Sequence, residues 1–226
     1  MTKPIIGIIG RRDKIVSTID REGNIVLYDY MDALDKEECS YIGLITNSNY
    51  DYIDENILKM CDGILMTGGV EIKTYHIEII KYAIAHNIPF FGICQGAQAL
   101  ALSTLTGAKL TPVNEENGEV IHAPELKGKE DLPKTVHKVY LDEGSLLYDL
   151  FGSIIDVNSN HHYLIPRVSE PMQVVGLALD NAIEAIEHKD KSVFAVGVQW
   201  HPENMESMQP LFKEFVNRAK IRKEVK

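Results

Sequence analysis

The sequence predicts an α/β protein with a mostly parallel central sheet, helices on both faces, and a small antiparallel addition in the C-terminal half. In the first half of the chain, short apolar β-rich runs alternate with helical stretches, as in a doubly wound sheet. After residue 135 the strand-like runs are often separated only by turn residues, which is typical of antiparallel pairs. Hydrophobic residues make up 45% of the 226 residues, enough to bury a sizeable core.

The first half of the chain contains alternating strand and helix candidates. Apolar positions Ile77, Ile80 and Ile84 recur at helical spacing, and Asn87 and Pro89 end that helix. The expected strands are residues 5–9, 41–45, 62–69 and 89–93, the third ending in paired glycines. The expected helices are residues 28–36, 53–60, 74–86 and 97–105.

The second half begins with a polar segment, residues 111–135, that we expect to form a long surface excursion. The strand candidates that follow are residues 136–141, 154–157, 172–179, 183–188 and 194–199, before a final helix at about 205–220. No internal repeat or low-complexity block divides the chain. We therefore expect one domain over residues 1–226.

Charge argues against two classes of partner. The chain carries 33 acidic and 23 basic residues, for a net charge of −10, so neither nucleic acid nor an anionic membrane is an expected ligand. The N-terminal apolar stretch is too short for a signal peptide, and no run approaches the roughly 20 residues of a membrane-spanning helix. Together with three cysteines that lack disulfide spacing, this predicts a cytoplasmic protein.

Known cofactor motifs are missing from the sequence. There is no phosphate loop, no G-x-G-x-x-G after a strand, and no histidine and cysteine cluster at metal-ligand spacing. We therefore expect neither a cofactor nor a metal. His122 and His137 bracket the polar middle segment, and the sequence leaves open whether they line the site or are surface histidines.

The most informative segment surrounds Cys94. It has the form G-x-C-x-G, with Gly92 and Gly96 flanking the cysteine directly after a strand and directly before a helix. This is the pattern of a nucleophile elbow, in which a sharp turn projects the nucleophile from the sheet edge. The N-terminus of the following helix favours the thiolate form. Cys39 and Cys61 lack such a context, so we interpret them as structural.

A thiolate nucleophile needs a base and a group that orients the base. His201 and Glu203 follow an apolar strand in a His-Pro-Glu sequence, so the carboxylate can bond one imidazole nitrogen and leave the other for sulfur. The oxyanion of an acyl intermediate needs donors as well. Gln95, which follows the nucleophile, supplies one backbone N–H, and the Gly68-Gly69 pair at a strand end is the candidate for the other.

These segments together resemble the class I (triad) glutamine amidotransferase-like superfamily, and within it the gamma-glutamyl-gamma-aminobutyrate hydrolase type of gamma-glutamyl hydrolase. The resemblance spans nearly the whole chain and implies a flavodoxin-like fold. The carrying segments are Asp62-Gly-Ile-Leu-Met-Thr-Gly-Gly, Gly92-Ile-Cys-Gln-Gly-Ala-Gln, Val157-Asn-Ser-Asn-His-His and Gly197-Val-Gln-Trp-His-Pro-Glu.

The resemblance also implies roles for matching positions. Cys94 is the expected nucleophile, His201 the base and Glu203 its partner, with Gly69 and Gln95 as oxyanion donors. The expected substrate-binding residues are Gln98, Ser159, His161 and His162. The implied reaction is hydrolysis of a gamma-glutamyl amide through a gamma-glutamyl thioester, which releases glutamate and an amine.

Two departures from the hydrolase pattern put the choice of substrate in question. The aspartate-containing loop that usually follows the paired glycines is missing, and residues 70–78 run almost directly into a helix. Position 95 is glutamine where the hydrolases usually have arginine. The shortened loop leaves the site more open, or leaves it to be completed by residues 111–135 or by a second subunit.

The sequence leaves three functions open. The first is a free-standing hydrolase of small gamma-glutamyl compounds, with a homo-oligomer neither required nor excluded. The second is a glutaminase subunit that delivers ammonia to a separate synthase. The third is a non-catalytic binding protein on the same fold, which only the shortened loop and Gln95 support.

Overall fold

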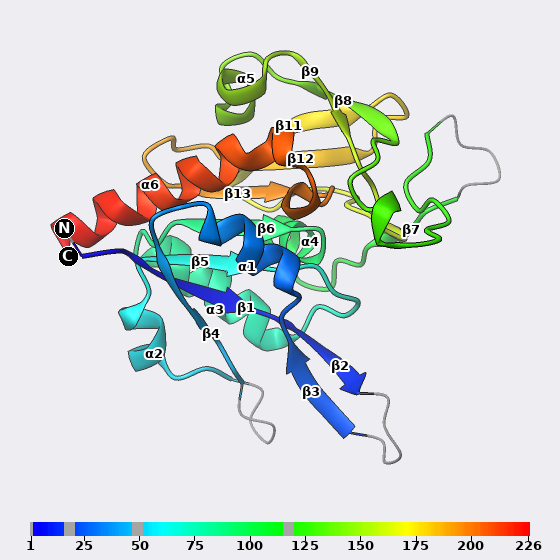
Figure 1. Ribbon diagram of the computed structural model, residues 1–226. Helices are drawn as coiled ribbons and strands as arrows, with labels where there is room; N and C mark the ends of the chain where they lie inside the picture. Colours follow the sequence, from blue (N-terminus) through cyan, green and yellow to red (C-terminus); the bar gives the residue numbers. More distant parts are fainter. Residues whose placement is uncertain (1, 16–20, 47–51, 115–119) are drawn as a thin grey trace.

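A nine-stranded sheet forms the centre of the molecule (Figure 1). The computed structural model describes residues 2–15, 21–46, 52–114 and 120–226. In spatial order the strands are β4 (Ser40–Gly43), β1 (Ile5–Ile9), β5 (Gly63–Met66), β6 (Phe90–Ile93), β13 (Ala195–Val198), β12 (Ile183–His188), β11 (Met172–Ala178), β8 (His137–Leu141) and β9 (Ile154–Val157).

The parallel half of the sheet runs from β4 to β13. Strands β5, β6 and β13 are buried at every position, as expected for parallel strands covered on both faces. Their registers pair Ile8 with Leu65, Leu65 with Phe91, and Gly92 with Gly197. The carboxyl ends of β1, β5, β6 and β13 therefore meet at one edge of the sheet.

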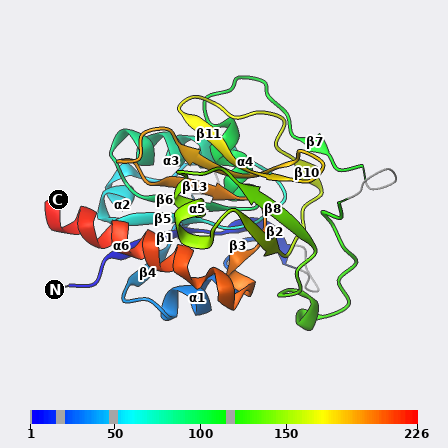
Figure 2. The same cartoon turned by 90° about the horizontal axis from the view of Figure 1, so that it is seen from above.

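Helices cover both faces, as the sequence predicts. Figure 2 shows the sheet between the two helical layers. Side chains of α1 (Tyr28–Asp35), α5 (Leu146–Phe151) and α6 (Gln209–Val225) share one apolar cluster with the strands. Side chains of α2 (Glu55–Met60), α3 (Thr74–Ala85) and α4 (Gln95–Leu102) share the other.

The C-terminal half extends the same sheet with antiparallel strands β12, β11, β8 and β9. One strand differs from the sequence-based grouping: β13 pairs parallel with β6 and antiparallel with β12, so it joins the two halves. The final helix also differs. It begins at Gln209 and continues to Val225, because residues 206–208 form a separate 3₁₀ turn.

Three smaller features surround the strand ends that carry the site. A hairpin of β2 (Arg11–Ile15) and β3 (Arg21–Ile25), which the sequence did not predict, follows β1 directly. Strand β7 (Thr111–Pro112) of the excursion pairs with β10 (Tyr163–Leu164). A 3₁₀ turn covers Lys129–Asp131, and residues 115–119 lie outside the described part.

Among the described helices, none is long and apolar enough to cross a membrane.

Candidate active site

The candidate catalytic residues follow three neighbouring parallel strands. Gly68 and Gly69 come after β5, Cys94 directly after β6, and His201 shortly after β13. A Cβ atom added to Gly68 would lie 3.1 Å from His201 Cε1 and 3.5 Å from Cys94 Cβ. Sequence-distant segments are thus brought into contact, at the edge where open α/β sheets place their sites.

Cys94 occupies a strained turn between β6 and α4. Its φ is 51° and its ψ is −103°, and it is 6% exposed. A Cβ on Gly92 would lie 2.5 Å from the Gly96 carbonyl carbon, and one on Gly96 would lie 2.4 Å from Met66 O. Only glycine fits at either position, because the turn presses its own backbone together and against β5. This is the geometry that a nucleophile elbow requires.

The thiols of Cys39 and Cys61 have raised pKa values. Burial raises the pKa of Cys39 to about 11, and the carboxylate of Asp35 adds to the effect. Burial likewise raises the pKa of Cys61 to about 11. Both thiols therefore stay protonated near neutral pH and are poor nucleophiles.

His201 is held by two partners. Its Nδ1 lies 2.7 Å from Glu203 Oε1, which leaves Nε2 buried and without a hydrogen-bond partner among the described residues. Asn158 fixes the backbone: its Oδ1 accepts from the His201 N–H at 2.9 Å and its Nδ2 donates to the His201 carbonyl at 2.9 Å. The imidazole is therefore oriented before any substrate binds.

The charge state of His201 follows from these neighbours. Burial lowers its pKa, but the Glu203 carboxylate and the Cys94 sulfur raise it more, and the net pKa lies well above the usual value. His201 therefore keeps its proton at pH values where an ordinary histidine loses it. The site can therefore hold a proton on His201 ready for a leaving group.

Tyr30 of α1 completes this part of the site. Its hydroxyl accepts the Gly68 N–H at 3.0 Å, so that amide is already satisfied. Burial, and then the Glu203 carboxylate, raises the pKa of Tyr30 well above its usual value, so the phenol stays neutral. With Gly68 occupied, the N–H of Gly69 is the amide of this pair that can serve an oxyanion.

A cavity of about 280 Å³ opens in front of Cys94. It suits a small substrate, and it has both a cation, Arg11, and an anion, Asp29, in its wall. Leu126 and Leu132 of the excursion also line it. Its other lining residues are Leu27, Tyr30, Gly68, Gly69, Val70, Asn158, Ser159, Asn160, His162, His201, Glu203 and Asn204.

The structure separates the residues expected to bind substrate. Ser159 and His162 line the cavity. Gln98 does not: its buried amide donates to Gln199 Oε1 and to the Tyr163 carbonyl, both at 3.1 Å. His161 does not either, because its ring points into the protein. The adjacent histidines therefore have different surroundings: the His161 ring is buried beside Glu184, whereas His162 lines the cavity.

Sequence reasoning missed four residues of the site. Tyr30 and Asp29 belong to no motif. Asn158 belongs to the Asn-Ser-Asn-His-His segment, but the segment itself does not indicate that this side chain holds the His201 backbone. Arg11 did have a signal: it closely follows a buried parallel strand, at the edge where sites gather. The side chain of Gln95, by contrast, lies against Gly69 and not in the cavity, since a Cβ on Gly69 would be 2.4 Å from Gln95 Oε1.

Comparison with known proteins identifies the family. Residues 73–203, more than half of the chain, match the peptidase C26 family and include the elbow and the His-Pro-Glu segment. The chain belongs to this family. It is thereby a member of the class I glutamine amidotransferase-like superfamily, as its sequence motifs predicted.

Relatives in this superfamily differ in length. A Schizosaccharomyces pombe protein provisionally named a glutamine amidotransferase is 36% identical over 146 residues, 63% of this chain and 55% of that protein. CTP synthase of Staphylococcus carnosus is 34% identical over 203 residues, 76% of this chain but 37% of the enzyme. This C26 chain thus spans about half or less of these two relatives.

Solved structures share the fold. The glutaminase domain of Trypanosoma brucei CTP synthase, solved with bound acivicin, superposes with a TM-score of 0.66 at 17% identity. The match covers 97% of this chain and 94% of that domain. It confirms the predicted architecture, a mostly parallel sheet between helices with an antiparallel extension.

Proposed function

We propose that this C26 protein hydrolyses the γ-amide bond of a small γ-glutamyl compound, with Cys94 as nucleophile. The observation that carries the proposal is the juxtaposition of a strained, helix-capping cysteine with a histidine that a carboxylate orients at 2.7 Å. Family membership supports a cysteine-dependent acyl transfer. The γ-glutamyl substrate is our inference from the motif resemblance and from the charges in the cavity.

The reaction follows from the positions of the groups. The Cys94 thiolate attacks the γ-carbonyl carbon, and the backbone N–H groups of Gly69 and Gln95 stabilise the oxyanion. The His201 imidazolium gives its proton to the leaving amine as the C–N bond breaks, which leaves a γ-glutamyl thioester on Cys94. His201, now neutral, takes a proton from water, which attacks the thioester and releases glutamate and the thiolate.

The cavity wall offers partners for the rest of the glutamyl group. Arg11 supplies a guanidinium for the α-carboxylate, and Asp29 supplies a carboxylate for the α-ammonium. Asp29 is also 3.1 Å from Lys129 Nζ, an exposed side chain that the ammonium would compete with. His162 and the Ser159 hydroxyl lie in the same wall. The Arg11 guanidinium thus gives the substrate carboxylate a local positive charge on a chain whose net charge is −10.

A second function has its own support. The similarity to the glutaminase part of CTP synthase favours a glutaminase that passes ammonia to a separate synthase. Such a chain would act on glutamine with low turnover alone and would need its partner for full rate. The hydrolase proposal requires full turnover by the isolated chain.

One experiment tests the proposal and separates the alternatives. The purified chain is incubated with L-glutamine and a panel of γ-glutamyl amides, and glutamate release is followed by mass spectrometry. We expect release from at least one amide by the wild type and by Cys39→Ala, and none by Cys94→Ala. Glutamate release from glutamine but from no other compound of the panel, at a rate that added cell extract increases, would favour the glutaminase. No release from any compound, with or without cell extract, would contradict both enzymatic functions.

A further inference from the structure

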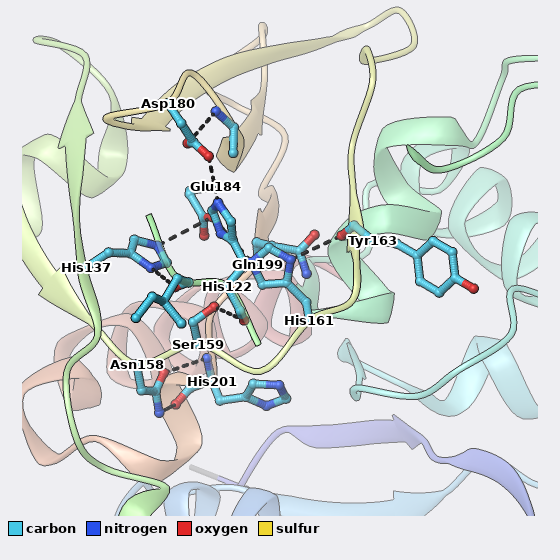
Figure 3. Close-up of polar contacts among 12 residues, drawn as sticks. His122, His137, Asn158, Ser159, His161, Tyr163, Asp180, Glu184, Gln199 and His201 are labelled. Carbon is cyan, nitrogen blue, oxygen red and sulfur yellow. Dashed lines mark hydrogen bonds and ion pairs between the residues drawn. The ribbon is translucent and has the colours of Figure 1, made fainter. Parts of the chain in front are cut away.

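A second polar cluster lies beside the active site, in the interior of the antiparallel half. His122, His137 and His161 converge on the carboxylate of Glu184 from β12, as Figure 3 shows. The Glu184 side chain is fully buried, and the side chains of His122 and His161 are 2% and 1% exposed. His201 lies on the other side of the Asn158–Ser159 segment (Figure 3), so the catalytic residues do not use this cluster.

The outer nitrogen of each histidine already has an acceptor. His122 Nε2 lies 2.9 Å from Asp180 Oδ2, His161 Nδ1 is 3.1 Å from the Tyr163 carbonyl, and His137 Nδ1 is 3.0 Å from the Ile121 carbonyl. Carbonyl and carboxylate oxygens only accept, so these nitrogens carry the ring protons. In a neutral imidazole, the inner nitrogen then presents a lone pair.

The inner atoms are therefore all electron-pair donors that face one another. His122 Nδ1, His161 Nε2 and His137 Nε2 lie 3.2, 3.3 and 3.5 Å from Glu184 Oε1. None of these atoms makes a hydrogen bond of acceptable geometry within the described residues. Buried lone pairs at this spacing repel unless a cation lies between them.

The three distances from Glu184 Oε1 match the ligand spacing of a tetrahedral metal ion. Zinc binds imidazole nitrogen and carboxylate oxygen at roughly 2.0–2.2 Å, so two ligands of a tetrahedron lie roughly 3.3–3.5 Å apart. The ligand atoms of His122, His161 and Glu184 all lie within 4.8 Å of one another. We propose that His122, His161 and Glu184 bind a structural Zn²⁺, with His137 as the fourth ligand.

The surroundings of the cluster resemble a metal's outer shell. In known sites a ligating histidine donates its other N–H to a carboxylate or a carbonyl, which fixes the tautomer and the ring orientation. Asp180 and the carbonyls of Tyr163 and Ile121 occupy these positions here. The set of imidazoles and a carboxylate suits zinc, and a closed set of four protein ligands is typical of a structural and not a catalytic ion.

The proposed ion would join two segments that line the active-site cavity to a strand of the central sheet. His122 belongs to the excursion, His161 to the loop that carries Ser159 and His162, and Glu184 to β12. The His161 N–H and the Ser159 hydroxyl both donate to the His122 carbonyl, at 3.0 and 2.6 Å. The ion would therefore hold the cavity-lining loop onto the sheet. This inference does not depend on the proposed reaction.

Metal analysis of the full chain tests the inference. The protein is purified without a histidine tag, its zinc content is measured, and the chelator-treated chain is titrated with Zn²⁺ and with Co²⁺ as a spectroscopic probe. We expect about one Zn²⁺ per chain and a tetrahedral Co²⁺ absorption spectrum that Zn²⁺ abolishes. We expect Asp180→Asn, which alters only the outer shell, to weaken binding about 10–100-fold.

Matched variants keep the test decisive. Glu184→Gln keeps the shape of the ligand and removes its charge, so we expect stoichiometric binding to be lost. His86→Gln, a change at the exposed histidine that follows the last residue of α3, should bind zinc like the wild type. A folded wild-type chain that binds neither ion at 1:1 stoichiometry would overturn the proposal and leave protons as the cations of the cluster. Zinc binding that neither Glu184→Gln nor Asp180→Asn changes would also overturn the proposal.

Discussion

The backbone of Cys94 has a conformation that few non-glycine residues adopt. At φ 51° its Cβ crowds the following peptide, at a cost of about 1–2 kcal/mol. Packing of Gly92 against Gly96, and of Gly96 against Met66, holds the turn in place. The strain aims the sulfur out of the sheet and toward His201, which is the placement a nucleophile needs.

The raised pKa of His201 predicts the pH dependence of the reaction. Burial lowers this pKa, but Glu203 and Cys94 raise it more, so the imidazolium persists above the usual histidine pKa of about 6.5. Because the leaving amine takes the proton from His201, kcat/KM for an amide should stay level through pH 6.5. It should fall only as pH rises through the higher pKa, which a pH–rate profile measures.

Glu203→Gln is the matched variant for this prediction. It removes the largest effect that raises the His201 pKa, so the alkaline fall should move toward pH 6.5. The rate should drop by about 10²-fold or more, the range for a positioned acid–base group. An unchanged alkaline limit in this variant would contradict the assigned pairing.

Tyr30 provides a prediction about the Gly68-Gly69 turn after β5, where Gly69 is the proposed oxyanion donor. Tyr30→Phe leaves the buried Gly68 N–H without its acceptor, which should cost about 1–3 kcal/mol in the free energy of unfolding. It should also lower kcat, since Gly69 follows in the same turn. Urea unfolding and steady-state kinetics measure both. Tyr28→Phe, at a 76% exposed position of the same helix, is the control and should change neither.

Arg11 provides a prediction about substrate binding. If its guanidinium binds the α-carboxylate, Arg11→Gln should raise KM about 10-fold, the effect of losing a charged hydrogen bond, with little change in kcat. Arg12→Gln is the control, because Arg12 bonds Glu22 and is absent from the cavity wall. Equal KM values for wild type and Arg11→Gln would assign the carboxylate to other groups.

Sequence motifs reveal site residues that need particular neighbours in the chain, but not residues that tertiary packing alone brings to the site. Cys94 could be predicted because glycines must flank an elbow, and His201 because a carboxylate two residues later can orient it. Tyr30 contributes one hydroxyl from a helix with no motif, so its role depends on packing alone. His161 illustrates the opposite limit: adjacent loop residues point to opposite sides, and only the structure shows which one faces the substrate.

At the scale of elements, strand positions were predictable but pairing direction was only partly so. The buried runs of β1, β5 and β6 are separated by helices, and that connection implies parallel strands. The residues of β13 do not indicate which strands lie beside it, so its parallel pairing with β6 could not be predicted from them. The hairpin of β2 and β3 was missed because its charged residues do not alternate with apolar ones.

The first turn of α3 carries a prediction about stability. His76 is buried, and its Nδ1 accepts the Lys73 N–H at 3.1 Å, which requires that nitrogen to be unprotonated. Burial, and then Lys73, lowers the pKa of His76 to about 4. Between about pH 6.5 and pH 4 the unfolded chain therefore takes up a proton that the native chain does not. Stability should fall over this window by a few kcal/mol.

His76→Gln tests this by comparison. Its amide oxygen can accept the same N–H, as in a capping box, but does not titrate. Urea denaturation at several pH values should show the wild type losing more stability than the variant between pH 6.5 and 4. Parallel curves would mean that His76 carries no such linkage.

At the scale of the whole molecule, the sheet edge gathers chemistry that a net charge of −10 would otherwise disfavour. Arg11 and the imidazolium of His201 line the cavity, together with the carboxylates of Asp29 and Glu203. Leu126 and Leu132 of the excursion line the same cavity.

Trapping the acyl-enzyme tests the central claim most directly. The isolated chain is mixed with a γ-glutamyl amide that it turns over, or with glutamine, quenched in acid within the first turnover, and digested for mass spectrometry. We predict that the peptide containing Cys94 gains the mass of one glutamyl group, that hydroxylamine removes it, and that Cys94→Ala shows no adduct. Glutamate release without an adduct, or an adduct on Cys39 or Cys61, would contradict the account.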